Sequence, residues 1–267
     1  VYESTFNIDC EKLEIAIKDT IKDGKLTPRA IIPVDLFGVP ARYRLIQDIA
    51  KKYNLKVIED AAQSFGGSIG EKKVGTFGEI AATSFYPAKP LGCYGDGGAM
   101  FTNDDHLAEQ CKAIRIHGTS SDRYNSEVIG LNGRLDSMQA AVLLEKLTIF
   151  DEELEMRNKV NDYYRKYLNN AQHIPDNYHS AHALFSVTLG SNQKREEMIH
   201  RLNKNNIPVV VYYKYPIHLM KGFAYLGYKK GNFLISEQLS NTIVSLPMHP
   251  YLNHDDIDII IETLIDK

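Results

Sequence analysis

The feature that most constrains the fold is a helical pattern enclosed by two apolar runs. The runs are RAIIPVDLFG at 29–38 and LKVIEDAAQ at 55–63, and between them Tyr43, Ile46 and Ile49 recur at helical spacing. Two strands joined by a helix within so short a stretch pair in parallel, with a right-handed crossover. The pattern therefore predicts an α/β domain with a buried, mostly parallel central sheet flanked by helices.

Further elements of this domain are predicted downstream. Strands are expected at 78–87 (GEIAATSFYP) and at 97–104 (GGAMFTND). A helix is expected at 105–118, with Asp104 or Asp105 as its cap. These elements extend the same sheet and cover it.

A long helical pattern divides the chain. Residues 137–169 contain no Gly or Pro and show helical spacing with an interruption at Arg157, so one long helix or two abutting helices are expected. We expect this segment to lead from a large domain at 1–150 to a smaller α+β domain at 151–267. The elements predicted in the smaller domain are a strand at 183–190, a helix at 195–206, a strand at 207–216 and helices near 236–245 and 255–266.

Composition limits the classes of partner. The net charge of −3 gives no reason to expect nucleic acid or an anionic membrane as a partner. No apolar run approaches the ~18 residues of a membrane-spanning helix. Three cysteines, without the spacing of a zinc site or a disulfide framework, indicate a reducing cytoplasm and no metal. The opening stretch VYESTFNID shows no helix cap and no leader, and we expect a further segment upstream of Val1.

Two charged residues stand where strands are predicted to end. Asp60 closes the run KVIED, and it either caps a following helix or is a buried anion that needs a positive partner. Lys89 follows the next run and is bracketed by Pro87 and Pro90. A lysine at a sheet edge is usually solvated, but the two prolines indicate that this one is held in position. Because ligands of parallel α/β sheets bind outside the carboxyl ends of the strands, we expect both residues at one site.

An aspartate and a lysine at one sheet edge suit pyridoxal phosphate (PLP). The lysine can form a Schiff base, and the aspartate can keep the pyridine nitrogen protonated, so that the ring acts as an electron sink. The Ser84 hydroxyl and backbone N–H groups can hold the phosphate. The sequence contains no G-x-G-x-x-G between a strand and a helix and no Walker A pattern. The GDGG at 95–98 precedes a predicted strand, so a plain turn is favoured over a phosphate loop.

Three motifs resemble those of one known family. They are VIEDAAQSFGG at 57–67, TSFYPAKPLGCYGDGGAMFTND at 83–104 and GLNGRLDSMQAAVLL at 130–144. In this order and spacing they are similar to motifs of the DegT/DnrJ family of nucleotide-sugar aminotransferases, which are fold-type I PLP enzymes. In the C-terminal part the resemblance is looser and rests on the stretches YPIHL and VSLPMHPYL. In the family a further segment precedes the position of Val1 and supplies helices, a strand and a loop that grips the phosphate.

The resemblance implies roles for individual residues. Lys89 would form the internal aldimine and move the proton between the sugar carbon and the cofactor. Asp60 would pair with the pyridine nitrogen, and Gln63 would hydrogen-bond the phenolic oxygen. Ala62 would pack on the face of the ring, and Ser84 would bind the phosphate.

Other matched positions concern a second subunit and the substrate. Asn132 resembles a residue that reaches the phosphate of the neighbouring subunit's cofactor, which implies a homodimer with active sites at the interface. Arg134 either touches the substrate or is a surface arginine. Lys214 and Tyr215 lie in KYPIHLM, which borders the sugar site in the family but departs here from its usual residues. Lys214 either contacts a substrate carboxylate or phosphate, or is solvated.

The resemblance also implies a reaction. Family members with a histidine in place of the lysine are dehydratases, so Lys89 favours transamination. KPLGCYGDGG is similar to enzymes that act at the 3-position of the sugar. The chain looks closest to aminotransferases that use glutamate, yielding 2-oxoglutarate, to make UDP-linked 3-amino-2-acetamido uronic acids for surface polysaccharide. A 4-position aminotransferase and a non-catalytic, PLP-binding regulatory paralogue are the alternatives.

Overall fold

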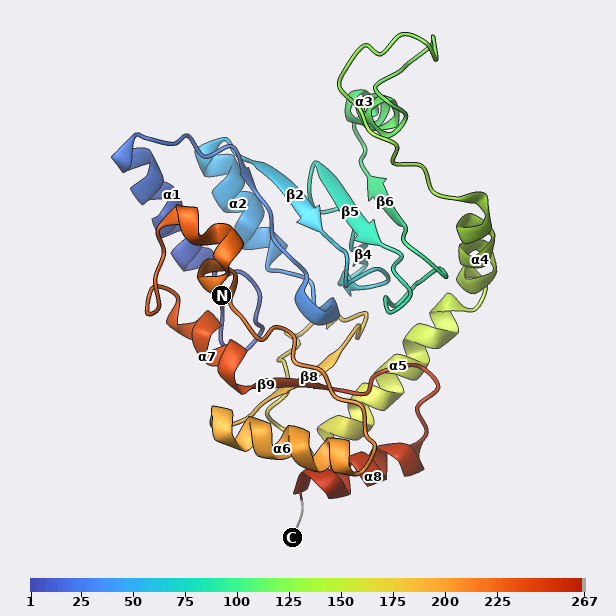
Figure 1. Ribbon diagram of the computed structural model, residues 1–267. Coiled ribbons are helices and arrows are strands. Elements are labelled where there is room, and N and C mark those ends of the chain that lie inside the picture. Colours follow the sequence, from blue (N-terminus) through green and yellow to red (C-terminus); the bar gives the residue numbers. More distant parts are fainter. Residues whose placement is uncertain (266–267) are drawn as a thin grey trace. The chain divides into compact units, whose positions relative to one another are not determined.

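The computed structural model describes residues 1–265, which form two compact units (Figure 1). The large unit comprises Ile8–Asp151 and Asn177–Ala181. The small unit comprises Val1–Asn7, Glu152–Asp176 and the chain from His182 onward. Each unit therefore draws together segments that are distant in the sequence.

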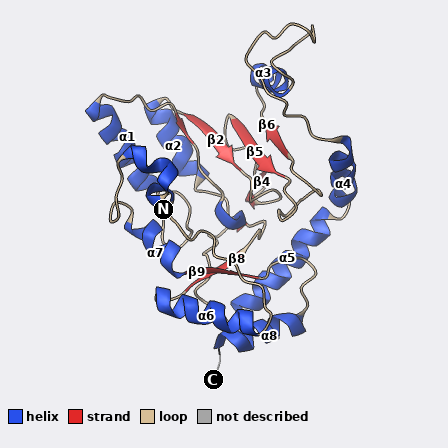
Figure 2. Ribbon diagram, viewed as in Figure 1, coloured by secondary structure: helices blue, strands red, loops and turns tan. Residues whose placement is uncertain are grey.

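The central sheet of the large unit has the strand order β1-β2-β5-β6, and Figure 2 shows β2, β5 and β6 side by side. Its strands are β1 (Ala30–Ile31), β2 (Lys56–Asp60), β5 (Ile80–Ser84) and β6 (Gly98–Phe101). β1, β2 and β5 run parallel, as predicted, whereas β6 runs antiparallel to β5, with Ser84 opposite Gly98. The connection at 85–97 contains no helix to carry the chain back across the sheet, which a parallel neighbour would need. The mostly parallel α/β fold is confirmed.

Helices and a second small sheet complete the large unit. The second sheet is antiparallel, in the order β4-β3-β7. Its strands are β3 (Ser68–Ile69), β4 (Lys72–Lys73) and β7 (Tyr178–His179). The helices are α1 (Cys10–Asp23), η1 (Leu36–Gly38), α2 (Tyr43–Tyr53), α3 (Asp105–Arg115) and α4 (Ser137–Leu147). The buried face of α2 consists of the predicted apolar positions.

Aspartates cap two of these helices. The side chain of Asp9 accepts the N–H groups of Glu11 and Lys12, each at 3.0 Å, so it is the N-cap of α1. The expectation that the opening stretch has no cap is therefore wrong, because the cap is its last residue. Of the two caps proposed for α3, Asp104 is the one observed, and it accepts the N–H of Leu107 at 3.1 Å.

The long helical pattern forms two helices, α4 and α5 (Phe150–Arg165). The break between them lies at 148–149 and not at Arg157, which is inside α5. The Arg157 side chain is buried and donates to the carbonyl oxygen of His182 at 3.0 Å. Arg157 interrupts the apolar periodicity because a hydrogen-bonded arginine occupies a buried position there, while the backbone stays helical.

The small unit has a two-stranded antiparallel sheet of β8 (Phe185–Thr188) and β9 (Ile243–Leu246). Its further helices are α6 (Asn192–Lys204), η2 (Ile217–Leu219), η3 (Lys221–Leu226), α7 (Leu234–Thr242) and α8 (His254–Ile265). The strand expected at 207–216 is wrong, because that segment contributes only an isolated bridge from Val210 to Ser245. β9, buried at all four residues, pairs with β8. The helix expected at 236–245 consequently ends at Thr242.

The core of the small unit forms where α5, α6, α8 and this sheet meet. It includes Tyr164, Val187, Leu202, Val244 and Ile257. Over residues 1–265, no helix is long and apolar enough to cross a membrane.

Candidate active site

Two predicted site residues lie at one edge of the central sheet. β2 and β5 are parallel neighbours, with Asp60 paired in register with Ala82. Both strands therefore end at the same edge, where Asp60 is the last residue of β2 and Ser84 the last residue of β5 (Figure 1). Lys89 lies in the turn that follows β5. This is the edge at which α/β sheets bind ligands.

The Lys89 side chain is half-buried beside a carboxylate. Burial lowers the pKa of Lys89, and the negative charge of Asp60 opposes that shift. The backbone N–H of Lys89 donates to the carbonyl oxygen of Tyr86 at 2.8 Å, which closes a tight turn. A lysine with a lowered pKa is more often the neutral amine, the form that attacks carbonyl groups.

The Lys89 turn is compact because a glycine lies beneath it. A Cβ at Gly92 would stand 2.6 Å from the carbonyl oxygen of Pro87 and 2.7 Å from that of Tyr86, so no larger residue fits. The N–H of Cys93 donates to the Phe85 carbonyl at 2.8 Å. The ammonium of Lys146, on α4, donates to the Gly92 carbonyl at 2.7 Å.

The turn after β2 presents Asp60 and Gln63. No helix follows Asp60, since residues 62–66 form turns, so the helix-cap alternative is wrong. The Asp60 carboxylate accepts the N–H of Ala62 at 3.1 Å. Gln63 Oε1 accepts the N–H of Phe37 at 2.6 Å, so the amide nitrogen is the end that carries the hydrogen-bond donors. Ala62 and Gln63 are both half-buried.

The glycine-rich stretch at 95–98 lets the backbone pass close to neighbouring segments at this edge of the sheet. A Cβ at Gly98 would stand 2.6 Å from the Thr83 carbonyl oxygen, and one at Gly97 would stand 2.9 Å from a methyl of Leu135. The Gly97 carbonyl accepts the N–H of Phe85 at 2.8 Å. The hydroxyl of Ser84 accepts the N–H of Tyr86 at 3.3 Å. The plain-turn interpretation of GDGG agrees with this packing.

The remaining predicted residues lie in other segments. Asn132 is exposed in the large unit and forms an isolated bridge with Ile116, next to the end of α3. Arg134 is exposed nearby in the chain. Lys214 and Tyr215 are exposed in the small unit, where the Lys214 ammonium lies 5.8 Å from the centre of the Tyr215 ring. The structure thus brings Asp60, Ala62, Gln63, Ser84 and Lys89 to one edge of the sheet, whereas Asn132 and Arg134 lie beyond the end of α3 in the same unit.

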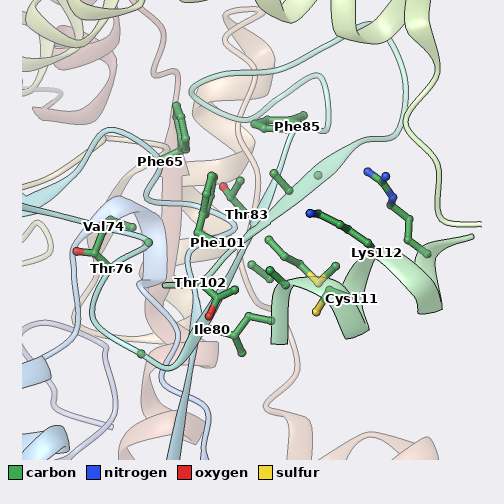
Figure 3. Close-up of a pocket in the computed structure, with 18 of the residues that line it drawn as sticks. Phe65, Val74, Thr76, Ile80, Thr83, Phe85, Phe101, Thr102, Cys111 and Lys112 are labelled. Carbon is green, nitrogen blue, oxygen red and sulfur yellow. The ribbon is translucent and has the colours of Figure 1, made fainter. Parts of the chain in front are cut away.

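The large unit also has a cavity at a different place. It has a volume of about 960 Å³ and is lined by β5, β6 and α3 (Figure 3). Phe65, Met100 and Phe101 contribute apolar walls, and Cys111 and Lys112 of α3 contribute polar atoms. Neither Lys89 nor Asp60 lines it. We therefore place the candidate site at the carboxyl edge of the sheet, where the reactive amine and the carboxylate meet.

Two residues behind the site were missed by the sequence interpretation. Asp35 is fully buried, and its N–H donates to the Asp60 carbonyl at 3.1 Å. Phe37 supplies the N–H that holds Gln63. The available signal was an aspartate inside the apolar run PVDLFG, where an unpaired charge would be costly.

The fold and this edge define a class of enzyme. A half-buried amine beside a carboxylate, at the carboxyl edge of a mostly parallel sheet, is the arrangement expected of a fold-type I PLP-dependent transferase. The chain belongs to the DegT/DnrJ/EryC1/StrS aminotransferase family, whose model matches residues 1–265. It is an enzyme, a PLP-dependent sugar aminotransferase, as the motifs predicted.

Curated relatives share most of the chain. UDP-2-acetamido-2-deoxy-3-oxo-D-glucuronate aminotransferase of Pseudomonas aeruginosa is 41% identical over 266 residues, covering 97% of this chain and 70% of the relative. A pleiotropic regulatory protein of Geobacillus stearothermophilus is 40% identical over 270 residues, covering 98% of this chain and 69% of the relative.

Solved structures share the fold. A DegT DnrJ EryC1 StrS aminotransferase from Brucella abortus superposes with a TM-score of 0.94 at 46% identity, covering 99% of this chain and 71% of that one. NtdA from Bacillus subtilis, solved with bound cofactor PMP, superposes with a TM-score of 0.85 at 27% identity, covering 99% of this chain and 60% of that one.

Proposed function

We propose that this chain moves an amino group from L-glutamate to the 3-keto carbon of a UDP-linked sugar, with PLP as cofactor, in the cytoplasm. The observation that carries the proposal is the half-buried Lys89 amine beside the Asp60 carboxylate. The relative from P. aeruginosa is named for a UDP-linked 3-oxo sugar, which favours the 3-position over the 4-position and UDP over other nucleotides. We also propose a role in making surface polysaccharide, which the motif resemblance implies. The three cysteines are present as thiols, which suits a reducing compartment.

The residues at the sheet edge fit PLP by their chemistry. They offer an amine of lowered pKa, a carboxylate close to it, an amide whose oxygen is already held, and a hydroxyl at the end of β5. When bound, PLP supplies an electron sink and carries the amino group between the two substrates. We assign its binding to the domain at 1–150, and we assign contacts to the sugar nucleotide to Arg134 and, in the domain at 151–267, to Lys214 and Tyr215.

Each residue at the edge has a distinct task in this proposal. The neutral Lys89 amine would hold the cofactor and then move a proton at the sugar carbon. The Asp60 carboxylate would accept a hydrogen bond from the pyridine nitrogen and keep it protonated. Gln63 would donate to the phenolic oxygen, Ala62 would pack against the ring, and Ser84 would donate to the phosphate.

We further propose that the active enzyme is a homodimer. Asn132 is exposed in the large unit and would reach the phosphate bound by a second copy. The exposure of Asn132 and Arg134 supports this assignment, since both are accessible to a partner. Mixing a Lys89→Ala chain with an Asn132→Ala chain should restore activity, because one of the two shared sites then has both residues intact.

Uptake of PLP on one particular lysine tests the cofactor assignment. The purified chain would be incubated with PLP and reduced with borohydride, and the tagged peptide identified by mass spectrometry. We expect the tag on Lys89 and no tag or turnover in Lys89→Ala. The matched control is Lys112→Ala, which removes the lysine that lines the large cavity and should leave the tag unchanged. A tag on Lys112, or full turnover by Lys89→Ala, contradicts the proposal.

A second candidate function is a regulator that binds PLP without transamination. The observation in its favour is the 40% identity to the pleiotropic regulatory protein of G. stearothermophilus. The two candidates differ in a visible-absorbance assay. Glutamate is added first, and 3-keto and 4-keto sugars linked to UDP or dTDP are then added in turn. An aminotransferase loses its original absorbance with glutamate and recovers it with its true substrate, whereas the absorbance of a non-transaminating regulator does not change with glutamate.

A further inference from the structure

A buried carboxyl group behind the candidate site has no part in the roles above. Asp35 is fully buried, and its side chain accepts hydrogen bonds from the Ala41 N–H at 2.8 Å, the Tyr43 hydroxyl at 2.9 Å and the Ser64 hydroxyl at 2.8 Å. Burying an ionisable group is costly unless hydrogen bonds compensate. The three donors that converge on Asp35 compensate this cost and link the carboxyl group to its neighbours.

The donors come from two segments that meet at Asp35. Two of them follow Asp35 in the same segment, 35–43, whereas Ser64 lies directly after Gln63 on the turn that follows β2. The backbone adds a second link between these segments, since the N–H of Asp35 donates to the Asp60 carbonyl at 3.1 Å. Asp35 therefore ties segment 35–43 to the turn that carries both Asp60 and Gln63.

Between these anchors the chain makes a strained turn that contacts Gln63. Phe37 has a φ of 62°, in the left-handed region that bulky residues rarely adopt, and its side chain is buried. Such a conformation persists only where surrounding contacts over-determine it. The N–H of Phe37 donates to Gln63 Oε1 at 2.6 Å, which fixes the acceptor end of the amide. The strained turn thus sets the orientation of the Gln63 side chain.

We propose that Asp35 is a positioning residue, which clamps segment 35–43 against Ser64 and so holds Gln63 in the orientation that binds the cofactor ring. The inference rests on the proposed function, because it concerns the same site. Asp35 lies behind the site, fully buried, and acts through Gln63.

The affinity for PLP, measured by visible absorbance, separates positioning from general stability. The variants are Asp35→Asn, which keeps the shape, and Ser64→Ala, which removes one hydrogen bond. Each is compared under conditions where circular dichroism shows the cofactor-free protein folded. We expect the Kd for PLP to rise at least about tenfold in Asp35→Asn and about threefold in Ser64→Ala.

Glu59→Gln is the matched control. Glu59 is also fully buried and lies on β2, but its carboxylate accepts the N–H groups of Gly75 and Phe77, at 2.6 and 2.9 Å, away from Gln63. Its replacement should lower the free energy of unfolding and change the Kd for PLP by less than about twofold. An increase in Kd equal to that of Asp35→Asn would show that any buried carboxylate matters alike, and would overturn the inference.

A double-mutant cycle tests whether Asp35 acts through Gln63. In a Gln63→Ala background, Asp35→Asn should change the Kd for PLP by less than about twofold, because the contact that it positions is already absent. Fully additive losses overturn the inference. If Asp35→Asn does not fold, the same cycle with Ser64→Ala decides the question.

The outcomes distinguish this inference from the proposed function. If the unaltered chain takes up no PLP on Lys89, the proposed function fails. If uptake on Lys89 is normal but neither Asp35→Asn nor Ser64→Ala changes the Kd for PLP, only the positioning role fails.

Discussion

The Lys89 ammonium experiences two opposing influences on its pKa. Burial lowers the pKa, because a charged amine loses hydration in a partly desolvated place, and the Asp60 carboxylate raises it by stabilising that charge. Burial is the larger influence, so the pKa lies below its ordinary value. Asp60, which we propose keeps the cofactor protonated, therefore also limits how readily the lysine becomes neutral.

Removing the Asp60 charge should lower the pKa of Lys89 further. We expect the rate of Lys89 acylation in cofactor-free Asp60→Asn to reach its half-maximum at a lower pH than in the unaltered chain. The rate is followed on the peptide that contains Lys89 by mass spectrometry. Asp19→Asn, on the exposed side of α1, is the control and should leave the profile unchanged. A profile that stays in place, or moves to higher pH, contradicts the proposed contact.

At the residue scale, the sequence predicted Asp60 and Lys89 but not the buried residues behind them. Asp60 and Lys89 were predicted because each follows a recognisable strand-like run. Asp35 and Phe37 were missed because their roles depend on hydrogen bonds to residues 29 and 26 positions away. No local pattern encodes such a separation.

The turn that carries Lys89 is the element on which the proposed chemistry depends. Its backbone passes so close to Gly92 that any side chain there would meet two carbonyl oxygens. Substitution with alanine must displace the turn, and with it the amine. The prolines on either side of Lys89 stiffen the same turn, since proline restricts φ.

Gly92→Ala should therefore reduce both stability and cofactor binding. We expect the free energy of unfolding, measured by urea titration with circular dichroism, to fall by about 1–3 kcal/mol. The Kd for PLP should rise, because Lys89 moves. Gly222→Ala is the control: its Cβ would meet nothing within 4 Å, and we expect a change within about 0.5 kcal/mol and an unaltered Kd. Equal effects of the two substitutions would argue against a required close approach at Gly92.

Elements were predictable where their signal is local. The helix at 43–53 and the strands at 56–60, 80–84 and 98–101 follow from periodicity and turn residues. The segment 207–216 has the composition of a strand but contributes only the bridge from Val210 to Ser245 of β9. Residues 243–246 form β9 beside β8, although a helix was expected near 236–245.

Each unit contains a buried ionisable group, and the two groups change the stability of the fold with pH in opposite directions. In the small unit, burial, then the charges of Arg165 and Arg157, lower the pKa of His182 to about 3 from 6.5. Its contribution to stability is present above pH 6.5 and is lost as the pH falls towards 3. In the large unit, burial raises the pKa of Asp35 to about 7 from 3.8, against its three hydrogen bonds. Its contribution is greatest below pH 3.8 and is lost as the pH rises towards 7.

Variants that lack one of these ionisable groups should reveal in which direction that group changes the stability with pH. Relative to His182→Gln, the unaltered chain should lose stability as the pH falls from 6.5, by up to about 1.4 kcal/mol per pH unit. Relative to Asp35→Asn, it should lose stability as the pH rises from 4 to 7. Urea titrations at a series of pH values measure both differences. Differences that do not vary with pH would show that neither group titrates as its burial implies.

The sequence by itself determined the fold class, the family and the lysine and aspartate of the proposed site. Those features are written in short-range periodicity, in strand ends and in contiguous motifs. Tertiary structure alone decided that β6 runs antiparallel, that residues 243–246 form a strand beside β8, and that Asp35 accepts a hydrogen bond from Ser64 on the turn bearing Gln63. The physical reason is that a buried hydrogen bond or strand pairing depends on which distant segments meet, and that choice belongs to the packing of the whole unit.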